Sequence, residues 1–169
     1  ASPAIQAADG NVSFTNDTTA RYEAAIESYY NARPVERFRF LLDELALTAY
    51  VQAENPEISN IDIAPGSTPG EAAVSVKVRR PIARWSIDGS DQYVDGDGVV
   101  FSRSFYPKPT LQIVDNSGIS ATNSQLVASD RFLGFIGRVV SKAESYDLAV
   151  DTVTIPAATT RQVALSLKQ

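Results

Sequence analysis

Residues 79–101 read "RRPIARWSIDGSDQYVDGDGVVF", and this stretch decides how the chain around it is interpreted. Its first half, "IARWSID", alternates apolar and polar residues around Trp85, which is typical of a strand. Its second half, "QYVDGDGVVF", places Asp95 and Asp97 among glycines, which suits either a calcium loop or the turn of a hairpin. Both alternatives use the same residues, so the spacing of the acids must separate them.

The spacing favours the hairpin. An EF-hand loop needs oxygen ligands at alternate positions from its start, but a loop that begins at Asp95 places Val99 at the fifth position. A loop that begins at Asp91 already fails at its third position. We therefore expect a turn that Asp95 caps through its side chain, with Gly96 or Gly98 at positive φ. We expect no metal site and no cofactor.

Composition excludes several kinds of chemistry. The 169 residues contain no Cys and no His, which removes thiolate nucleophiles, zinc-thiolate sites and a histidine general base. A glycosidase site at the acidic cluster is disfavoured, because the neighbouring aromatic residues Trp85 and Tyr93 fall at strand positions typical of a core. The formal net charge of −5 disfavours a nucleic-acid partner. We predict that the protein is not an enzyme and has no catalytic residues.

Upstream of the opening stretch, the pattern predicts strand, helix, helix, strand, strand. We expect a short strand near residues 5–8 and a helix that ends by Ala32, with Asn16 or Asp17 as its N-cap. A second helical region covers 35–54, either as one helix or as two with a break near Leu45. Its apolar stripe comprises Phe38, Leu41, Leu42, Leu45 and Ala49. Strands follow in "ISNIDIAP" (58–65) and "EAAVSVKVRR" (71–80), so residues 1–80 read as a compact α+β unit.

Downstream, the pattern predicts a mainly antiparallel β domain with one helix over residues 81–169. Short strands are expected in "LQIVD" (111–115), "YDLAVDTVTIP" (146–156) and "RQVALSLKQ" (161–169). A helix is expected in "SDRFLGFIGRVVSKAE" (129–144), where two glycines suggest close packing against a sheet. The apolar stripe of this helix comprises Phe132, Phe135, Ile136, Val139 and Val140.

Parts of this pattern resemble the bacterial cell-division family FtsQ/DivIB. In that family an Arg-Pro-x-Ala-x-Trp strand, here "RRPIARW" (79–85), leads to a hairpin like "YVDGDGVVF" (93–101). "NPEISNIDI" (55–63) is similar to the family's link into the second strand of its POTRA module, and "LAVDTVTIPAATTRQVALSLKQ" (148–169) to a later strand pair. The chain departs from the family at Arg79, where the family usually carries an acidic residue.

The resemblance implies a POTRA-like β-α-α-β-β module over residues 1–80 and a β-rich domain, truncated at its C-terminus, over 81–169. It also implies that the chain is an extracytoplasmic fragment, periplasmic or external, of a single-pass inner-membrane protein. The implied function is a non-enzymatic divisome scaffold that binds FtsB- and FtsL-type division proteins by strand addition and, through them, regulates the septal peptidoglycan synthase. The alternative is a POTRA-type binding module of an outer-membrane assembly or secretion protein.

Five residues are candidates for partner binding. Arg79 and Arg84 belong to a basic group, which could equally be a solvated strand face with long stems over apolar surface. The final segment alternates, with Val163, Leu165 and Leu167 on one side. If the outer edge of this strand is unpaired, it is either an artefact of truncation or a docking site, because its free amide and carbonyl groups invite another strand. The resemblance implies that the family's principal partner edge lies further toward the C-terminus, beyond this sequence.

Overall fold

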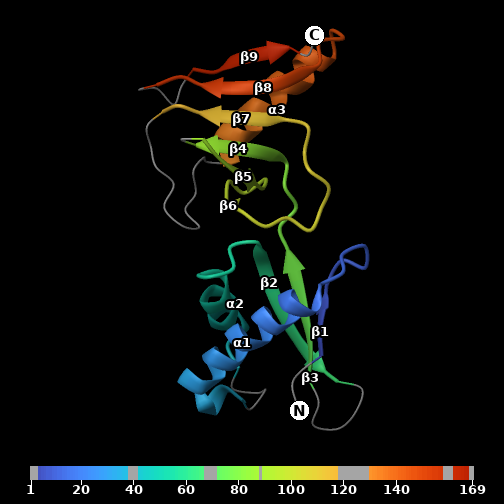
Figure 1. Ribbon diagram of the computed structural model, residues 1–169, viewed down its shortest axis with the longest axis vertical. Coiled ribbons are helices and arrows are strands. Elements are labelled where there is room, and N and C mark those ends of the chain that lie inside the picture. The colour runs from blue at the N-terminus through green and yellow to red at the C-terminus, as the bar shows by residue number, and fades with distance from the viewer. Residues whose placement is uncertain are drawn as a thin grey trace. The chain divides into compact units, whose positions relative to one another are not determined.

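The structure is a computed structural model, and it describes residues 4–37, 42–66, 72–87, 89–117, 130–157 and 162–167. The chain forms two compact units, Ala1–Arg79 and Arg80–Gln169 (Figure 1). Each unit has its own sheet and helices, which confirms the α+β class. No helix within the described ranges is long and apolar enough to cross a membrane.

The first unit has the predicted order of strand, helix, helix, strand, strand. Its three strands lie in the order β1-β3-β2, with β1 parallel and β2 antiparallel to the central β3. Apolar side chains alternate along β3, where Val74 and Val76 are buried and Lys77 is exposed. The elements are β1 (Ala4–Ala7), α1 (Asn16–Ala32), the 3₁₀ turn η1 (Pro34–Arg37), α2 (Glu44–Gln52), β2 (Ile58–Pro65) and β3 (Ala72–Val78).

The start of α1 differs from the expectation. The N-cap is Thr15, whose Oγ1 accepts a hydrogen bond from the backbone N–H of Thr18 at 3.3 Å, and not Asn16 or Asp17. Threonine satisfies one of the free N–H groups of the first turn as asparagine or aspartate would. Three neighbouring polar residues can all serve as caps, so composition alone could not choose between them.

The second helical region is broken, which matches the alternative of two helices, and its predicted stripe is wrong at Leu45 and Ala49. The 3₁₀ turn ends at Arg37, and α2 begins at Glu44 after Asp43, whose Oδ1 accepts a bond from Ala46 N–H at 3.0 Å. The new start shifts the phase of the helix, so that Leu45 is 80% exposed. The buried residues of α2 are Leu47, Thr48 and Val51. Phe38 and Leu41 of the predicted stripe lie outside the described residues.

The second unit is a six-stranded sheet with one helix in its described part. The strand order is β6-β5-β4-β7-β8-β9. Three pairings are antiparallel, β4 with β5, β5 with β6 and β8 with β9, whereas β7 runs parallel to both β4 and β8. The elements are β4 (Ala83–Ile87), β5 (Ser90–Val94), β6 (Val100–Phe101), β7 (Gln112–Asp115), α3 (Asp130–Glu144), β8 (Val150–Ile155) and β9 (Ala164–Leu167).

The core of the second unit lies between this sheet and α3. Trp85 at its centre is 1% exposed, and α3 contributes the buried side chains of Leu133 and Ile136. The predicted stripe on α3 is wrong for Phe135, which is 41% exposed because it lies on the outer side of the helix. The other members of the cluster are Ala83, Val94, Val100, Ile113, Val153 and Ile155.

Candidate functional site

The acidic stretch forms a turn, as predicted. The Asp95 carboxylate is buried, and its Oδ1 accepts hydrogen bonds from the backbone N–H groups of Asp97 at 3.1 Å and Val99 at 2.9 Å. Asp95 N–H in turn donates to Val99 O at 3.1 Å, and Gly98 takes the positive φ of 84°. In the part of the chain that the structure describes, no three acids gather to hold a metal ion.

Replacing Asp95 with alanine should destabilise the second unit by about 1–3 kcal/mol, because two turn N–H groups lose their acceptor. The measurement is the free energy of unfolding from urea titration. Asp91→Ala removes an exposed carboxylate from the same hairpin and is the matched control, for which we expect a change within about 0.5 kcal/mol. Equal effects of the two substitutions would contradict the capping role.

The two candidate arginines are held by backbone carbonyls. In the first unit, Arg79 Nε donates to Pro56 O at 2.9 Å, and Arg79 N–H donates to Glu57 O at 2.7 Å. In the second unit, Arg84 lies on β4 and its Nη2 donates to Thr110 O at 3.1 Å. Two strands, β7 and β8, separate β4 from β9 in the sheet order, so the structure does not bring Arg84 to the last strand.

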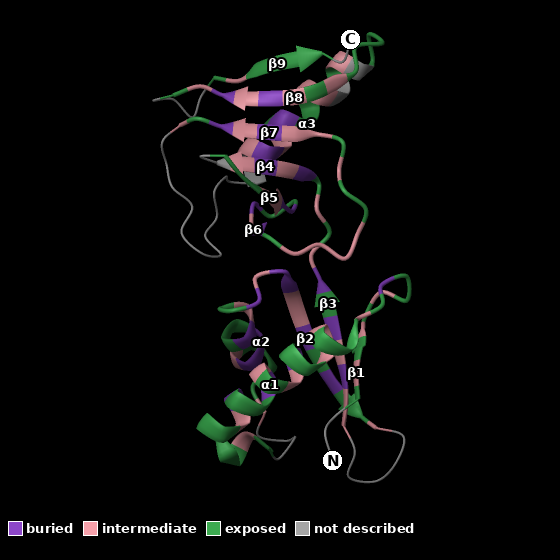
Figure 2. Cartoon of the chain, viewed as in Figure 1, coloured by how far each residue is buried: buried purple, intermediate pink, exposed green. Residues whose placement is uncertain are grey.

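The last strand, β9, is the most open edge of the second unit. All four of its residues are exposed, and no described strand pairs with its outer side. Figure 2 shows β9 as exposed beside β8, which carries buried segments. Leu165 and Leu167 remain 37% and 46% exposed, although large apolar side chains are usually covered in a sheet.

The two leucines lie on the core face of the sheet. Leu165 is paired with Val153 and Leu167 with Val150, and directly opposed residues of antiparallel strands point to the same face. Val153 is fully buried in the core cluster, and Val150 and Val163 pack against that cluster. Every strand of this sheet except β9 contributes to the cluster. The apolar face therefore continues onto β9 without a described element to cover it there.

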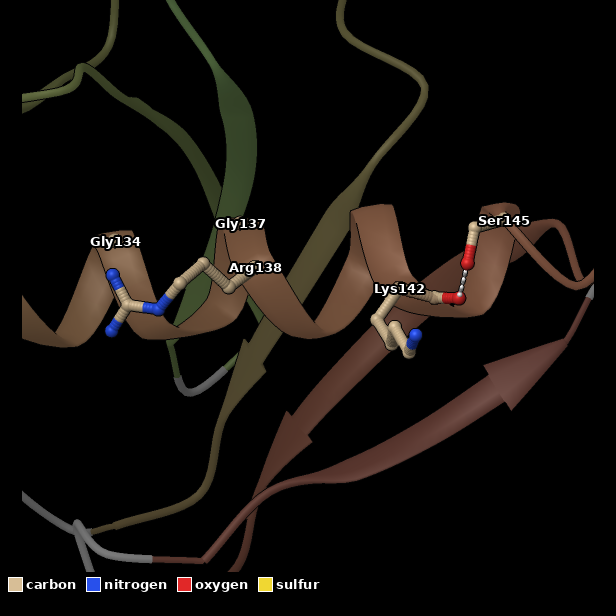
Figure 3. Close-up of a pocket in the computed structure, with 5 residues that line it drawn as sticks. All are labelled: Gly134, Gly137, Arg138, Lys142 and Ser145. Atoms are coloured by element: carbon tan, nitrogen blue, oxygen red, sulfur yellow. Dashed lines mark hydrogen bonds between the residues drawn. The ribbon is translucent and has the colours of Figure 1, made fainter.

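A shallow hollow on the outer face of α3 is a weaker candidate. Its lining residues are Gly134, Gly137, Arg138 and Lys142 from α3, and Ser145 from the turn that follows it (Figure 3). Arg138 lies back over Gly134, and Ser145 donates to Lys142 O at 2.7 Å. A ligand pocket normally gathers polar groups from several elements, so this face lacks the convergence of a binding site. The exposed Gly137 also contradicts the expectation that both glycines pack against the sheet.

One polar stripe, on α2, was not predicted from the sequence. Glu44, Thr48 and Gln52 recur four residues apart on α2, and their side chains bond to the backbone of β2. The spacing is visible in the sequence, but polar residues on one side of a helix normally indicate a solvated face. Only the position of β2 beside the helix gives these residues a partner.

The fold and the open edge define an α+β protein of two units, the second of which presents a strand edge with two aligned leucines in its described part. The sequence matches no known family model, and it has no significant match among curated proteins.

Proposed function

We propose that this chain is the extracytoplasmic part of a bacterial divisome scaffold of the FtsQ/DivIB type. It has no catalytic role, and it binds FtsB- and FtsL-type division proteins by strand addition. Through these partners it regulates the septal peptidoglycan synthase, and its parent is anchored in the inner membrane by a single helix. The family part of this proposal is supported by the resemblance of residues 79–101, which form the Trp85 strand and the Asp95 turn.

Within this chain, the observation that carries the binding mode is the open edge of β9, which is separate from the principal partner edge that the resemblance implies further toward the C-terminus. An added strand gains affinity from main-chain hydrogen bonds and specificity from its alternating side chains. Leu165 and Leu167 supply an apolar face on which a partner strand with apolar residues at alternate positions can pack. Covering the exposed part of two leucines contributes on the order of 1–3 kcal/mol. The alternative, a POTRA-type secretion module, accounts for the first unit but gives no role to this second sheet.

The test is binding of this chain to the extracytoplasmic segments of FtsB- and FtsL-type proteins, measured by isothermal titration calorimetry. We expect the double substitution Leu165→Asp and Leu167→Asp to weaken binding by at least about tenfold, because it places charges where the partner's apolar side chains pack. Backbone amides of β9 should become protected from hydrogen exchange when the wild-type chain binds.

Ser166→Asp is the matched control, because Ser166 is exposed on the same strand but points to the opposite face. It should leave the affinity within about twofold of the wild type. Failure of both segments to bind would overturn the proposed role of the β9 edge as a partner site. Equal losses of affinity from Ser166→Asp and from the leucine substitutions would instead reject the proposal that the partner packs on the core face. Strand addition at β9 would remain supported.

A further inference from the structure

Helix α2 lies along the outer side of β2, away from the central strand β3 (Figure 1). Three side chains of α2 form hydrogen bonds with the backbone of β2. Thr48 Oγ1 accepts a hydrogen bond from Ile61 N–H at 3.1 Å, and Glu44 Oε1 accepts one from Ile63 N–H at 3.3 Å. At the other end of the contact, Gln52 Nε2 donates to Ile58 O and Ser59 O, both at 3.0 Å.

These bonds occupy the groups that an added strand would use. In an edge strand, every second residue directs its N–H and C=O away from the sheet, and these groups are a template for another chain. Ile61 and Ile63 are two residues apart, so their N–H groups point the same way, toward α2. Ile61 and Ile63 are in register with Val76 and Val74 of β3, so β2 is paired with β3 on one side and with α2 on the other.

The spacing of the three side chains matches this task. Glu44, Thr48 and Gln52 are four residues apart, which places them on one line along the helix. The helix runs antiparallel to β2, because its first residue bonds to Ile63 and its last bonds to Ile58 and Ser59. Thr48 at the centre is 6% exposed and Ile61 is fully buried, so water does not compete for that bond.

We propose that α2 closes the outer edge of β2 to strand addition, so that the first unit pairs with neither a second copy of itself nor an extended peptide at this edge. Side chains that satisfy an edge are one way in which proteins prevent association between sheets. The inference concerns β2 alone and holds independently of what binds β9. The contrast between the two edges is direct, since β2 carries a helix along it whereas β9 is exposed along its whole length.

Hydrogen exchange of single amides in the full chain tests the closed edge. In the wild type, the amides of Ile61 and Ile63 should be protected although β2 is an edge strand. Thr48→Val keeps the shape of the side chain but removes the acceptor, and should speed exchange at Ile61 by at least about tenfold. Exchange at Ile63 should change much less, because its acceptor is Glu44.

Thr48→Ser keeps a hydroxyl and is the matched control, for which Ile61 should stay protected. Rapid exchange of Ile61 in the wild type, or exchange unchanged in Thr48→Val, would overturn the inference. The single substitution is conservative in volume, so this readout holds even if variants with more changes fail to fold.

Self-association tests the consequence. The double variant Thr48→Val and Gln52→Leu should form dimers or larger species in sedimentation velocity at concentrations where the wild type does not. The probe is the protein itself, whose second copy offers the same β2 edge. A folded double variant that associates no more than the wild type would overturn the role of α2 in blocking addition, whatever the outcome of binding at β9.

Discussion

Replacing Trp85 with alanine is expected to cost the second unit about 3–5 kcal/mol of unfolding free energy. Trp85 is 1% exposed, lies at the centre of the core cluster on β4, and is the largest fully buried side chain in the described part of the chain. Because a domain is stable by only about 5–15 kcal/mol, this loss leaves the second unit close to unfolding. Hydrogen exchange of the full chain should show lost protection in β4, β7 and β8.

Trp85→Phe separates packing from polarity. The indole Nε1 is buried and has no hydrogen-bond acceptor among the described residues, so phenylalanine removes an unsatisfied donor together with part of the ring system. We therefore expect phenylalanine to cost clearly less than alanine. Protection of the first unit is the internal control and should not change, because that unit has a core of its own. A loss below about 1 kcal/mol in Trp85→Ala would contradict the central role of this residue.

Alkaline pH is expected to destabilise the first unit through Tyr29. Burial raises the pKa of this phenol from 10.0 to about 12, and the hydrogen bond that its Oη donates to Glu36 acts in the same direction. The phenol is protonated in both states below pH 10. Between pH 10 and about 12 the unfolded chain loses this proton while the folded chain keeps it, so stability falls as pH rises.

The expected slope is about 1.4 kcal/mol of unfolding free energy per pH unit in that window. Urea titrations at a series of pH values from 8 to about 11.5 measure it. Tyr29→Phe should lower stability at pH 8, because Glu36 loses a donor, and should flatten the alkaline slope. Some slope should remain, because burial also raises the pKa of Tyr30.

Tyr50→Phe is the matched control for this prediction. Tyr50 is 41% exposed, and its Oη pairs with Ser28 Oγ at the surface. Its removal should leave the free energy of unfolding at pH 8 within about 0.5 kcal/mol of the wild type, in contrast to Tyr29→Phe. An identical slope in the wild type and in Tyr29→Phe would reject Tyr29 as the origin of the effect.

The alternation of apolar and polar residues predicted the strands well, because it depends only on which face of each strand is buried. Val74 and Val76 alternate with Ser75 and Lys77, and this pattern has the same meaning wherever β3 lies in the sheet. The Asp95 turn was predictable for the same reason, since a carboxylate beside glycines bonds to backbone groups a few residues away. Both features depend on local chemistry that the sequence records directly.

Helix faces were harder to predict because their phase depends on where each helix starts. The predicted stripe over 35–54 included Leu45 although a break near it was left open, and a helix start at Glu44 turns Leu45 toward solvent. Phe135 fits the period of α3 and is still exposed, because the sheet meets the other side of that helix. The roles of Thr48 and Leu165 depend on which strand lies beside them, and that is set by pairing between distant segments.

The incomplete cover of β9 would couple the proposed strand addition to the stability of the second unit. A ligand that binds only the folded state stabilises it by an amount that grows with the logarithm of ligand concentration, about 2.7 kcal/mol at one hundred times the dissociation constant. A chain that pairs with β9 would extend the sheet by one strand and cover the core face where it now ends at Leu165 and Leu167. The melting temperature of the second unit should therefore rise with the fraction of β9 edges that are occupied. It can be measured without a label on either molecule.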